Sequence, residues 1–364
     1  MEFIPAAKPI IGAEEREAVD RVLRGGMVAQ GPEVAQFEEE FSAHFVLDRP
    51  TVAVNSGTAG LHLGLLAAGI GPGDEVIVPS FTFAATGNSV VLAGATPVFA
   101  DIDSSTYTLD PAAVEAAVTP RTRAIMPVHL YGHPARMAEI VTLARQHDLL
   151  VIEDSAQAHG AAVNGRPVGT LGDVAMFSLY PTKNMTSGEG GMVVARDTEV
   201  ARTVRLLRNQ GMEKQYENEI VGFNARMTDI HAAIGRVQLT KVDGWTEIRR
   251  AHAAFLDQNL RGVGLPTVRE DSSHVYHQYT VRIPAGRDRF ALALREEFNI
   301  GSGVYYPIPN HRLPSLAKYA RELHLPETER AAREVLSLPV HPSLSDSDLD
   351  RIVSAVNYLA NGTR

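Results

Sequence analysis

The sequence predicts an α/β protein, with a large domain built on a mostly parallel seven-stranded sheet and a smaller α+β domain after it. Between residues 51 and 195, short β-branched apolar runs alternate with helical patterns, which is typical of a parallel sheet covered by helices. Further along, this alternation ends, and helices with one strand-like run precede a proline-rich stretch. The length of 364 residues suits about two domains. We expect the large domain over residues 1–244 and the small domain over residues 245–364.

The large domain is expected to begin with two helices, at residues 14–23 and 32–45. Pro32 fits the first turn of the second helix, because an N–H group has no helical partner there. The apolar side chains of this helix recur every three or four residues and predict one buried stripe: Val34, Phe37, Phe41 and Phe45. We interpret these rings as core residues, not as a cofactor site.

Seven apolar runs predict the sheet, and helical patterns lie between several of them. The expected strands are Thr51–Val54, Glu75–Pro79, Pro97–Ala100, Ala124–Val128, Leu149–Glu153, Val174–Ser178 and Met192–Ala195. The expected helices are Thr82–Ala93, Pro111–Val118 and Ala135–His147. Parallel strands need such crossover connections, so the order of elements supports a single large sheet.

The C-terminal part of the chain shows a different order of elements. Helical patterns are followed by one strand-like run, one more helix and a proline-rich stretch. In chain order these are Thr228–Val242, Gly244–Gln258, Tyr276–Ile283, Phe290–Phe298 and Tyr305–Pro314. This mixture predicts the smaller α+β domain.

The composition excludes several classes of protein. The chain has 34 Lys+Arg and 43 Asp+Glu, a net charge of −9, which repels a phosphate backbone, so we expect no nucleic-acid partner. It has no Cys, so disulfides, thiolate nucleophiles and Cys-bound metals are excluded. No signal-peptide pattern opens the sequence, and no apolar run reaches the roughly 18 residues of a membrane span. We therefore expect a cytoplasmic protein without a membrane segment.

Lys183 is the first candidate for chemistry. It lies in the stretch Ser178–Asn184, shortly before the glycine-rich run at residues 188–191 that precedes a strand. A lysine held in such an irregular segment can be desolvated, which lowers its pKa and frees the amine to form a Schiff base with a carbonyl. For a lysine taken alone, an exposed surface position is the simpler interpretation.

Asp154 is the second candidate. It follows the apolar run at residues 149–152, and open α/β sheets bind their ligands at the carboxyl ends of the strands. A carboxylate there can keep a heteroaromatic nitrogen protonated, since a nearby anion favours the cationic form. A helix N-cap is an equally good explanation of Asp154 alone.

Two further segments complete the pattern. The turn Asn55–Gly60 joins a strand to an apolar helix, and its free N–H groups with the hydroxyls of Ser56 and Thr58 can hold a phosphate; a plain turn and N-cap would look the same. The segment Pro79–Thr86 follows another strand and carries Phe83, which could stack on a planar ring. A phosphate seat, a stacking ring, a strand-end carboxylate and a glycine-flanked lysine together suit pyridoxal 5′-phosphate.

On these motifs the chain resembles the DegT/DnrJ/EryC1/StrS family of sugar aminotransferases, a branch of the fold type I pyridoxal-phosphate transferases. The resemblance extends over Pro9–Asn357. The matching segments are Gly31–Glu38, Asn55–Thr58, Glu153–Ala158, Pro181–Asn184 and Gly222–Met227.

The resemblance implies a role for each matching residue. Lys183 would form the internal aldimine and Asp154 would pair with the pyridine nitrogen; these are the two predicted catalytic residues. The remaining cofactor-binding residues would be Gly57, Thr58 and Ser178 at the phosphate, Phe83 and Ala156 on the two ring faces, Gln157 near the ring hydroxyl, and Asn224 reaching the phosphate from a neighbouring subunit. A homodimer with shared active sites is therefore implied.

The resemblance also implies the reaction: amino transfer, with L-glutamate as donor, onto a keto group of a nucleotide-linked sugar by a ping-pong mechanism. The candidate substrate contacts are Arg226, Tyr306 and His311. A sugar dehydratase is a rival, although relatives of that kind typically carry His in place of the lysine. An aminocyclitol-type ketone as acceptor, or a regulatory relative that binds without turnover, also stays open.

No metal site is expected. His129 and His133 are four residues apart, but Gly132 and Pro134 interrupt the helix that would place both rings on one face. Two positions depart from the family pattern, Arg136 and Gln210. Neither belongs to the cofactor set, so both bear on substrate specificity alone.

Overall fold

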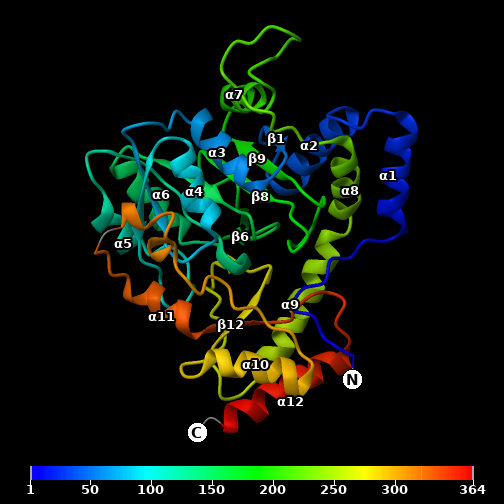
Figure 1. Ribbon diagram of the computed structural model, residues 1–364, viewed down its shortest axis with the longest axis vertical. Helices are drawn as coiled ribbons and strands as arrows, with labels where there is room; N and C mark the ends of the chain where they lie inside the picture. Colours follow the sequence, from blue (N-terminus) through cyan, green and yellow to red (C-terminus); the bar gives the residue numbers. More distant parts are fainter. Residues whose placement is uncertain (1, 321, 363–364) are drawn as a thin grey trace.

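The computed structural model describes residues 2–320 and 322–362, and within them seven strands form the predicted large sheet (Figure 1). Its order is β1-β9-β8-β5-β4-β2-β3. The strands are β1 Thr51–Val54, β2 Glu75–Pro79, β3 Thr96–Ala100, β4 Thr122–Ile125, β5 Leu150–Asp154, β8 Val174–Ser178 and β9 Gly191–Ala195. All seven predicted strands are present, with ends that differ by at most three residues.

The sheet is mostly parallel, as expected. β3, β2, β4, β5 and β8 are joined by parallel pairings, whereas β9 runs antiparallel to both of its neighbours, β8 and β1. Because β1 is thus aligned with β8, the carboxyl ends of β1, β2, β5 and β8 all lie at one edge. This edge carries the predicted site residues.

Helices cover both faces of the sheet. One face packs against α3 Gly57–Ala67, α4 Ala84–Leu92 and α7 Thr198–Arg208. The other packs against α2 Pro32–Phe45 and α8 Asp229–Leu239 at one end, and against α5 Pro111–Ala117 and α6 Met137–Gln146 at the other. Successive strand residues point to opposite faces, so Val52 and Val54 join the first cluster and Ala53 the second. The predicted stripe of α2 is buried, with Phe37 and Phe41 fully inaccessible.

The N-terminal helices are fixed by a contact that is distant in sequence. α1 Ala13–Gly25 packs on α8, and α2 begins beside the start of α8. The buried carboxylate of Asp229 accepts hydrogen bonds from the backbone N–H groups of Gly31 (2.7 Å), Glu33 (3.2 Å) and Val34 (3.1 Å). These are the groups that a helix N-terminus leaves unpaired, so Asp229 stabilises the start of α2 from another helix.

The C-terminal part forms a separate cluster below the sheet (Figure 1). It consists of α9 Val242–Asn259, α10 Arg287–Phe298, α11 Pro326–Glu334 and α12 Asp346–Gly362, with the antiparallel pair β11 Tyr279–Arg282 and β12 Val335–Leu338. Short elements complete the chain: β6 Ala162–Val163, β7 Arg166–Pro167, β10 Ser272–Ser273 and the 3-10 turns η1 Leu130–Gly132, η2 Asn310–Arg312 and η3 Ala317–Tyr319. The expected boundary between residues 244 and 245 lies inside α9. The division into two domains stays a proposal.

Candidate active site

The predicted site residues follow the ends of four strands that share one edge of the sheet. Asp154 ends β5 and Ser178 ends β8, while Gly57 begins the helix after β1 and Phe83 precedes the helix after β2. Neighbouring parallel strands place their carboxyl ends together, so segments about 120 residues apart in sequence meet here. The fold therefore gathers most of the predicted cofactor set at one place.

Asp154 is buried and oriented by two hydrogen bonds. Thr86 Oγ1 donates to its Oδ2 at 2.8 Å, and the backbone N–H of Ala156 donates to its Oδ1 at 3.2 Å. Burial raises the pKa of Asp154, while Thr86, Ala156 and the nearby charge of Lys183 act in the opposite direction. Asp154 ends a strand and does not cap a helix, so the N-cap interpretation is excluded.

Lys183 lies on the irregular loop between β8 and β9, where its backbone N–H donates to the carbonyl of Tyr180 at 3.0 Å. Its Nζ makes no hydrogen bond or ion pair with any residue that the structure describes. Burial lowers the pKa of Lys183 to about 8, against the opposing charge of Asp154. An exposed surface lysine would not be shifted in this way, and a pKa of about 8 leaves about a tenth of this amine neutral at pH 7 and about half at pH 8.

The start of α3 and the end of β8 form a cradle of hydrogen-bond donors. Ser56 caps α3 by accepting from the N–H of Ala59 at 3.1 Å, which leaves the N–H groups of Gly57 and Thr58 in the first turn, where helices attract anions. A Cβ at Gly57 would lie 3.0 Å from Ser178 Cβ. Glycine therefore favours this close approach, which brings the Ser178 hydroxyl beside the helix terminus.

The two residues predicted to contact the ring faces follow the ends of two different strands, β2 and β5. Phe83 precedes α4 and is 62% exposed, although its flanking segment is largely buried. Ala156 is half-buried two residues after Asp154. The exposed ring of Phe83 is accessible to a ligand at this edge of the sheet.

Gln157 is buried and bonded on both sides. Its Oε1 accepts from the backbone N–H of Tyr131 at 2.6 Å, and its Nε2 donates to the hydroxyl of Tyr306 at 2.7 Å. Tyr306 was predicted to contact the substrate. The structure places its hydroxyl against Gln157, which belongs to the predicted cofactor set. Whether it also touches substrate stays a prediction.

A fully buried Glu153–His129 pair supports the site and was not predicted. Ala135 N–H donates to His129 Nδ1 at 3.0 Å, so the opposite nitrogen, Nε2, donates to Glu153 at 3.0 Å. Glu153 also accepts three backbone N–H groups at 2.6 to 2.9 Å, from Gly169, Leu171 and Gly172. Burial alone would raise its pKa, but these donors outweigh burial and lower it. The sequence signal was available: an acidic residue in an otherwise apolar strand must be paired.

Asn224 and Arg226 lie beside the start of α3, on the strand-like segment that leaves the loop after α7. Arg226 pairs with Val54 as an isolated bridge, and its Nη1 donates to Asn209 Oδ1 at 2.8 Å. Asn224 is exposed. The loop before it projects from the body of the molecule next to α7 (Figure 1), and Tyr216 and Val221 on it are 84% and 91% exposed.

The hydrogen-bond partners of His311 do not belong to the predicted site. Its Nδ1 is 2.6 Å from the Ser80 hydroxyl and its Nε2 is 3.2 Å from Glu329 Oε1. The side chain is buried, and both ring nitrogens are engaged. These contacts explain His311 as a link between the end of β2 and α11, so we leave it out of the proposed substrate contacts.

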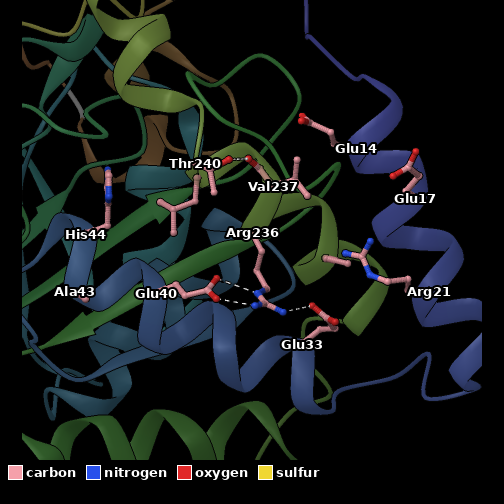
Figure 2. Close-up of a pocket in the computed structure, with 12 residues that line it drawn as sticks. Glu14, Glu17, Arg21, Glu33, Glu40, Ala43, His44, Arg236, Val237 and Thr240 are labelled. Carbon is pink, nitrogen blue, oxygen red and sulfur yellow. Dashed lines mark hydrogen bonds and ion pairs between the residues drawn. The ribbon is translucent and has the colours of Figure 1, made fainter.

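A large groove lies away from this site. It measures about 840 Å³ and lies between α1, α2 and α8, where Figure 2 shows Arg236 between Glu33 and Glu40. Arg236 donates to Glu33 at 2.5 Å and to Glu40 at 2.6 Å and 2.9 Å. Its charge is neutralised within the chain, and none of the predicted site residues lines the groove.

The residues at the sheet edge fit pyridoxal phosphate in donor chemistry. The cradle at Gly57, Thr58 and Ser178 presents donors for a phosphate, the buried carboxylate of Asp154 suits a protonated ring nitrogen, and the Lys183 amine is unpartnered and has a lowered pKa. An α/β sheet with these residues at its strand ends defines a class of protein: a pyridoxal-phosphate-dependent transferase.

The comparison with known sequences then identifies the family. A sequence model of the DegT/DnrJ/EryC1/StrS aminotransferase family matches residues 9–357. The chain belongs to this family, and the protein is an aminotransferase. The predicted family and fold class are confirmed.

Individual relatives are similar over nearly the full length. The chain is 44% identical over 362 residues to the dTDP-3-amino-3,4,6-trideoxy-alpha-D-glucose transaminase of Streptomyces venezuelae, with 98% of this chain and 95% of the relative covered. The crystal structure of S. venezuelae DesV in complex with a ketimine intermediate matches with a TM-score of 0.92 at 45% identity, covering 96% and 94%. Bacillus subtilis NtdA with bound cofactor PMP matches with a TM-score of 0.89 at 32% identity, covering 96% and 83%.

No helix among the described residues combines the length and apolar character needed to cross a bilayer.

Proposed function

We propose that this aminotransferase moves an amino group from L-glutamate onto a keto group of a nucleotide-linked sugar, with Lys183 as the central catalytic residue. The observation that carries the proposal is the state of Lys183: its amine has a pKa lowered to about 8 and no partner within the described chain, and it lies close enough to Asp154 for their charges to interact. The sugar part rests on similarity to relatives such as the dTDP-amino-sugar transaminase.

The predicted cofactor, pyridoxal phosphate, is confirmed, since solved structures that this chain resembles contain it in its PLP or PMP form. When bound, it supplies an electron sink for charge that develops on the substrate carbon. We propose that the Gly57–Thr58 turn and Ser178 hold its phosphate, while Phe83 and Ala156 contact the two ring faces. These assignments agree with the donor geometry at the strand ends.

Asp154 has the position and the surroundings for keeping a ring nitrogen protonated. Its two oxygens already accept from Thr86 and Ala156, which fixes the direction of the carboxylate. The nearby positive charge of Lys183 favours its ionised form against burial. A buried anion in a fixed orientation stabilises a cationic partner strongly, because little water screens the interaction.

Lys183 Nζ is the group that can move protons. With a pKa near 8, the amine takes up and releases a proton readily near neutral pH, as general acid–base catalysis requires. Donor and acceptor both need this one amine, so we propose that they bind in turn, in a ping-pong mechanism. Arg226, beside the start of α3, is the proposed contact for the diphosphate of the sugar nucleotide.

We further propose a homodimer in which Asn224 of one chain reaches the phosphate site of the other. Asn224 is exposed, and the preceding loop presents Tyr216 and Val221 to the surroundings. A closed two-fold pair would cover the exposed side chains of Tyr216 and Val221 in both chains at once. The loop contributes nothing to the core of its own chain.

The deciding experiment records the visible absorption spectrum of the purified protein with pyridoxal phosphate, before and after L-glutamate is added without acceptor. We expect a visible cofactor band that glutamate converts to the pyridoxamine form, and amino transfer once nucleotide keto-sugars are supplied. A band that glutamate leaves unchanged would contradict the donor and favour a dehydratase or a binding protein. Transfer to an aminocyclitol ketone, and to no sugar nucleotide, would contradict the acceptor class.

A further inference from the structure

The side-chain amide of Gln157 is fixed in one orientation. A backbone N–H can only donate, so the amide atom that faces the N–H of Tyr131 at 2.6 Å must be the oxygen. The NH₂ group is therefore on the other side, where it donates to Tyr306 Oη at 2.7 Å. One N–H of Gln157 remains, and it can only be a donor.

Tyr306 maintains the orientation of the Gln157 amide, because its hydroxyl accepts the hydrogen bond from Gln157 Nε2. Gln157 is 5% exposed, so a free amide there could not turn to water for its partners. Without the Tyr306 hydroxyl, one N–H of the amide would lose its acceptor, and the side chain would rotate to find another. The direction of the remaining N–H depends on Tyr306.

The two residues that bond to Gln157, Tyr131 and Tyr306, have strained backbones that the packing of their rings maintains. Tyr131 and Tyr306 have φ values of 60° and 57°, a left-handed conformation that costs non-glycine residues energy and persists where surrounding contacts enforce it. Their rings stack at 6.4 Å with an interplanar angle of 15°. Phe81 packs edge-on against both, at 6.4 Å and 5.6 Å. The packing leaves the two anchors a single arrangement.

Tyr306 comes from the C-terminal part of the chain, whereas Gln157 follows the strand that carries Asp154. Within the Tyr305–Tyr306 pair, Tyr306 is the residue that reaches Gln157. Tyr306 thus links the cofactor site on the sheet to the segment that begins near Gly303, and Asn310 of the same segment also donates to the carbonyls of Ser80 and Thr82 after β2. Gly303 itself pairs with Ser337 of β12.

We propose that Tyr306 is a positioning residue for the cofactor, which acts through Gln157 by holding its remaining N–H as a donor toward the ring oxygen of pyridoxal phosphate. This rests on the proposed function, in which Gln157 lies near the ring hydroxyl. A fixed donor there favours the anionic form of that oxygen and so the deprotonated form of the chromophore.

The test is a pH titration of the visible absorbance of the cofactor-loaded protein, with Tyr306→Phe against the native chain. Phe keeps the stacked ring and removes the acceptor for Gln157. We expect the titration midpoint to rise by about one pH unit, the effect of losing one hydrogen bond to a charged group. We also expect kcat to fall while KM for the keto-sugar stays within twofold.

The matched control is Tyr305→Phe, which removes a hydroxyl from the adjacent tyrosine of the same segment. Among the described residues the Tyr305 hydroxyl bonds to Gln278 and not to Gln157, so the titration midpoint of this variant should stay at the native value. An equal rise in both variants would show a general loosening of the segment and would overturn the proposal.

A double-mutant cycle shows whether Tyr306 acts through Gln157. Gln157→Leu should raise the midpoint by itself, and adding Tyr306→Phe to it should change little further, because the coupling is already lost. Additive shifts would overturn the proposal. So would an unshifted midpoint in Tyr306→Phe with a raised KM, which would make Tyr306 a direct substrate contact. If the native protein shows no visible cofactor band, the proposed function itself fails, which is a separate outcome.

Discussion

The inner and outer parts of the active site differ in how completely one chain builds them. The inner part, which we define as Glu153, Asp154 and Lys183, consists of two buried carboxylates at the end of β5 and the lysine of the loop after β8, and both carboxylates have hydrogen-bond partners within the chain. The outer part, defined as Phe83, Tyr180 and the loop at residues 213–224, is mostly exposed: Tyr180 is 48% accessible and Val221 almost wholly so. A single chain builds the inner part completely and leaves the outer part uncovered.

This difference separates the chemistry from the selection of substrate. Buried, fully bonded groups are preorganised, which electrostatic catalysis requires. The exposed apolar side chains of the outer part can pack against another surface, which a second chain or a substrate can provide. We therefore expect substitutions in the inner part to abolish catalysis in every setting, and substitutions in the outer part to be rescued by an intact neighbouring chain.

The largest effect is expected from Lys183→Ala. Removing the group that moves the proton should lower turnover by about a thousandfold or more, measured as amino transfer from glutamate to a nucleotide keto-sugar. Lys318→Ala, which alters an exposed lysine over Tyr319, is the control and should retain native turnover. Native-like turnover in Lys183→Ala would remove the inner part from the mechanism.

A smaller loss is expected from Asp154→Asn, which keeps the shape and removes the charge. We expect turnover to fall about a hundredfold, the order of effect of losing a preorganised electrostatic contact. Thr86→Val removes only the hydroxyl that orients Asp154 and should cost roughly tenfold, the equivalent of one hydrogen bond to a charged group. If Thr86→Val cost as much as Asp154→Asn, orientation would matter more than charge.

The outer part is tested by mixing variants. Asn224→Asp places an anion at the proposed phosphate contact and should lower turnover roughly tenfold or more. After denaturation and joint refolding with Lys183→Ala chains, hybrid dimers should contain one intact site each, so about a quarter of native activity should return. The same two variants refolded separately and then mixed form the control. No recovery after joint refolding would contradict shared sites.

The smallest effect concerns pH. The pKa of Lys183 is lowered to about 8, so the neutral fraction of its amine rises as pH increases through 8 and levels off above it. The rate at which cofactor-free protein takes up pyridoxal phosphate should rise roughly fivefold between pH 7 and pH 8, measured by the growth of the visible band. A rate that still rises steeply at pH 10 would indicate an unperturbed lysine.

The linear sequence predicted the sheet and the inner site well, for a physical reason. Buried parallel strands are continuous apolar runs, so they stand out from their neighbours, and all seven were placed correctly. Lys183 and Asp154 stood out because a charged residue next to such a run needs an explanation. The strand ends differ by a few residues because hydrogen-bond pairing, not composition, decides where a strand stops.

Long-range partners could not be predicted in this way. Nothing near Gly31 indicates that Asp229 stabilises the start of α2, 198 residues away. His311 resembled a substrate contact in its local motif, but its partners are Ser80 and Glu329. The link between Gln157 and Tyr306 spans 149 residues and has no local pattern at all.

The sequence by itself determined the α/β class, the order of the strands along the chain and the chemical groups that the reaction needs, because periodicity and residue type are local properties. The tertiary structure decided which of these groups meet and in what state. The strand order within the sheet brings Asp154 beside Thr86 and near Lys183, and burial then lowers the lysine pKa to about 8. Burial and orientation arise from contacts between distant segments, and they convert a set of residue types into a site.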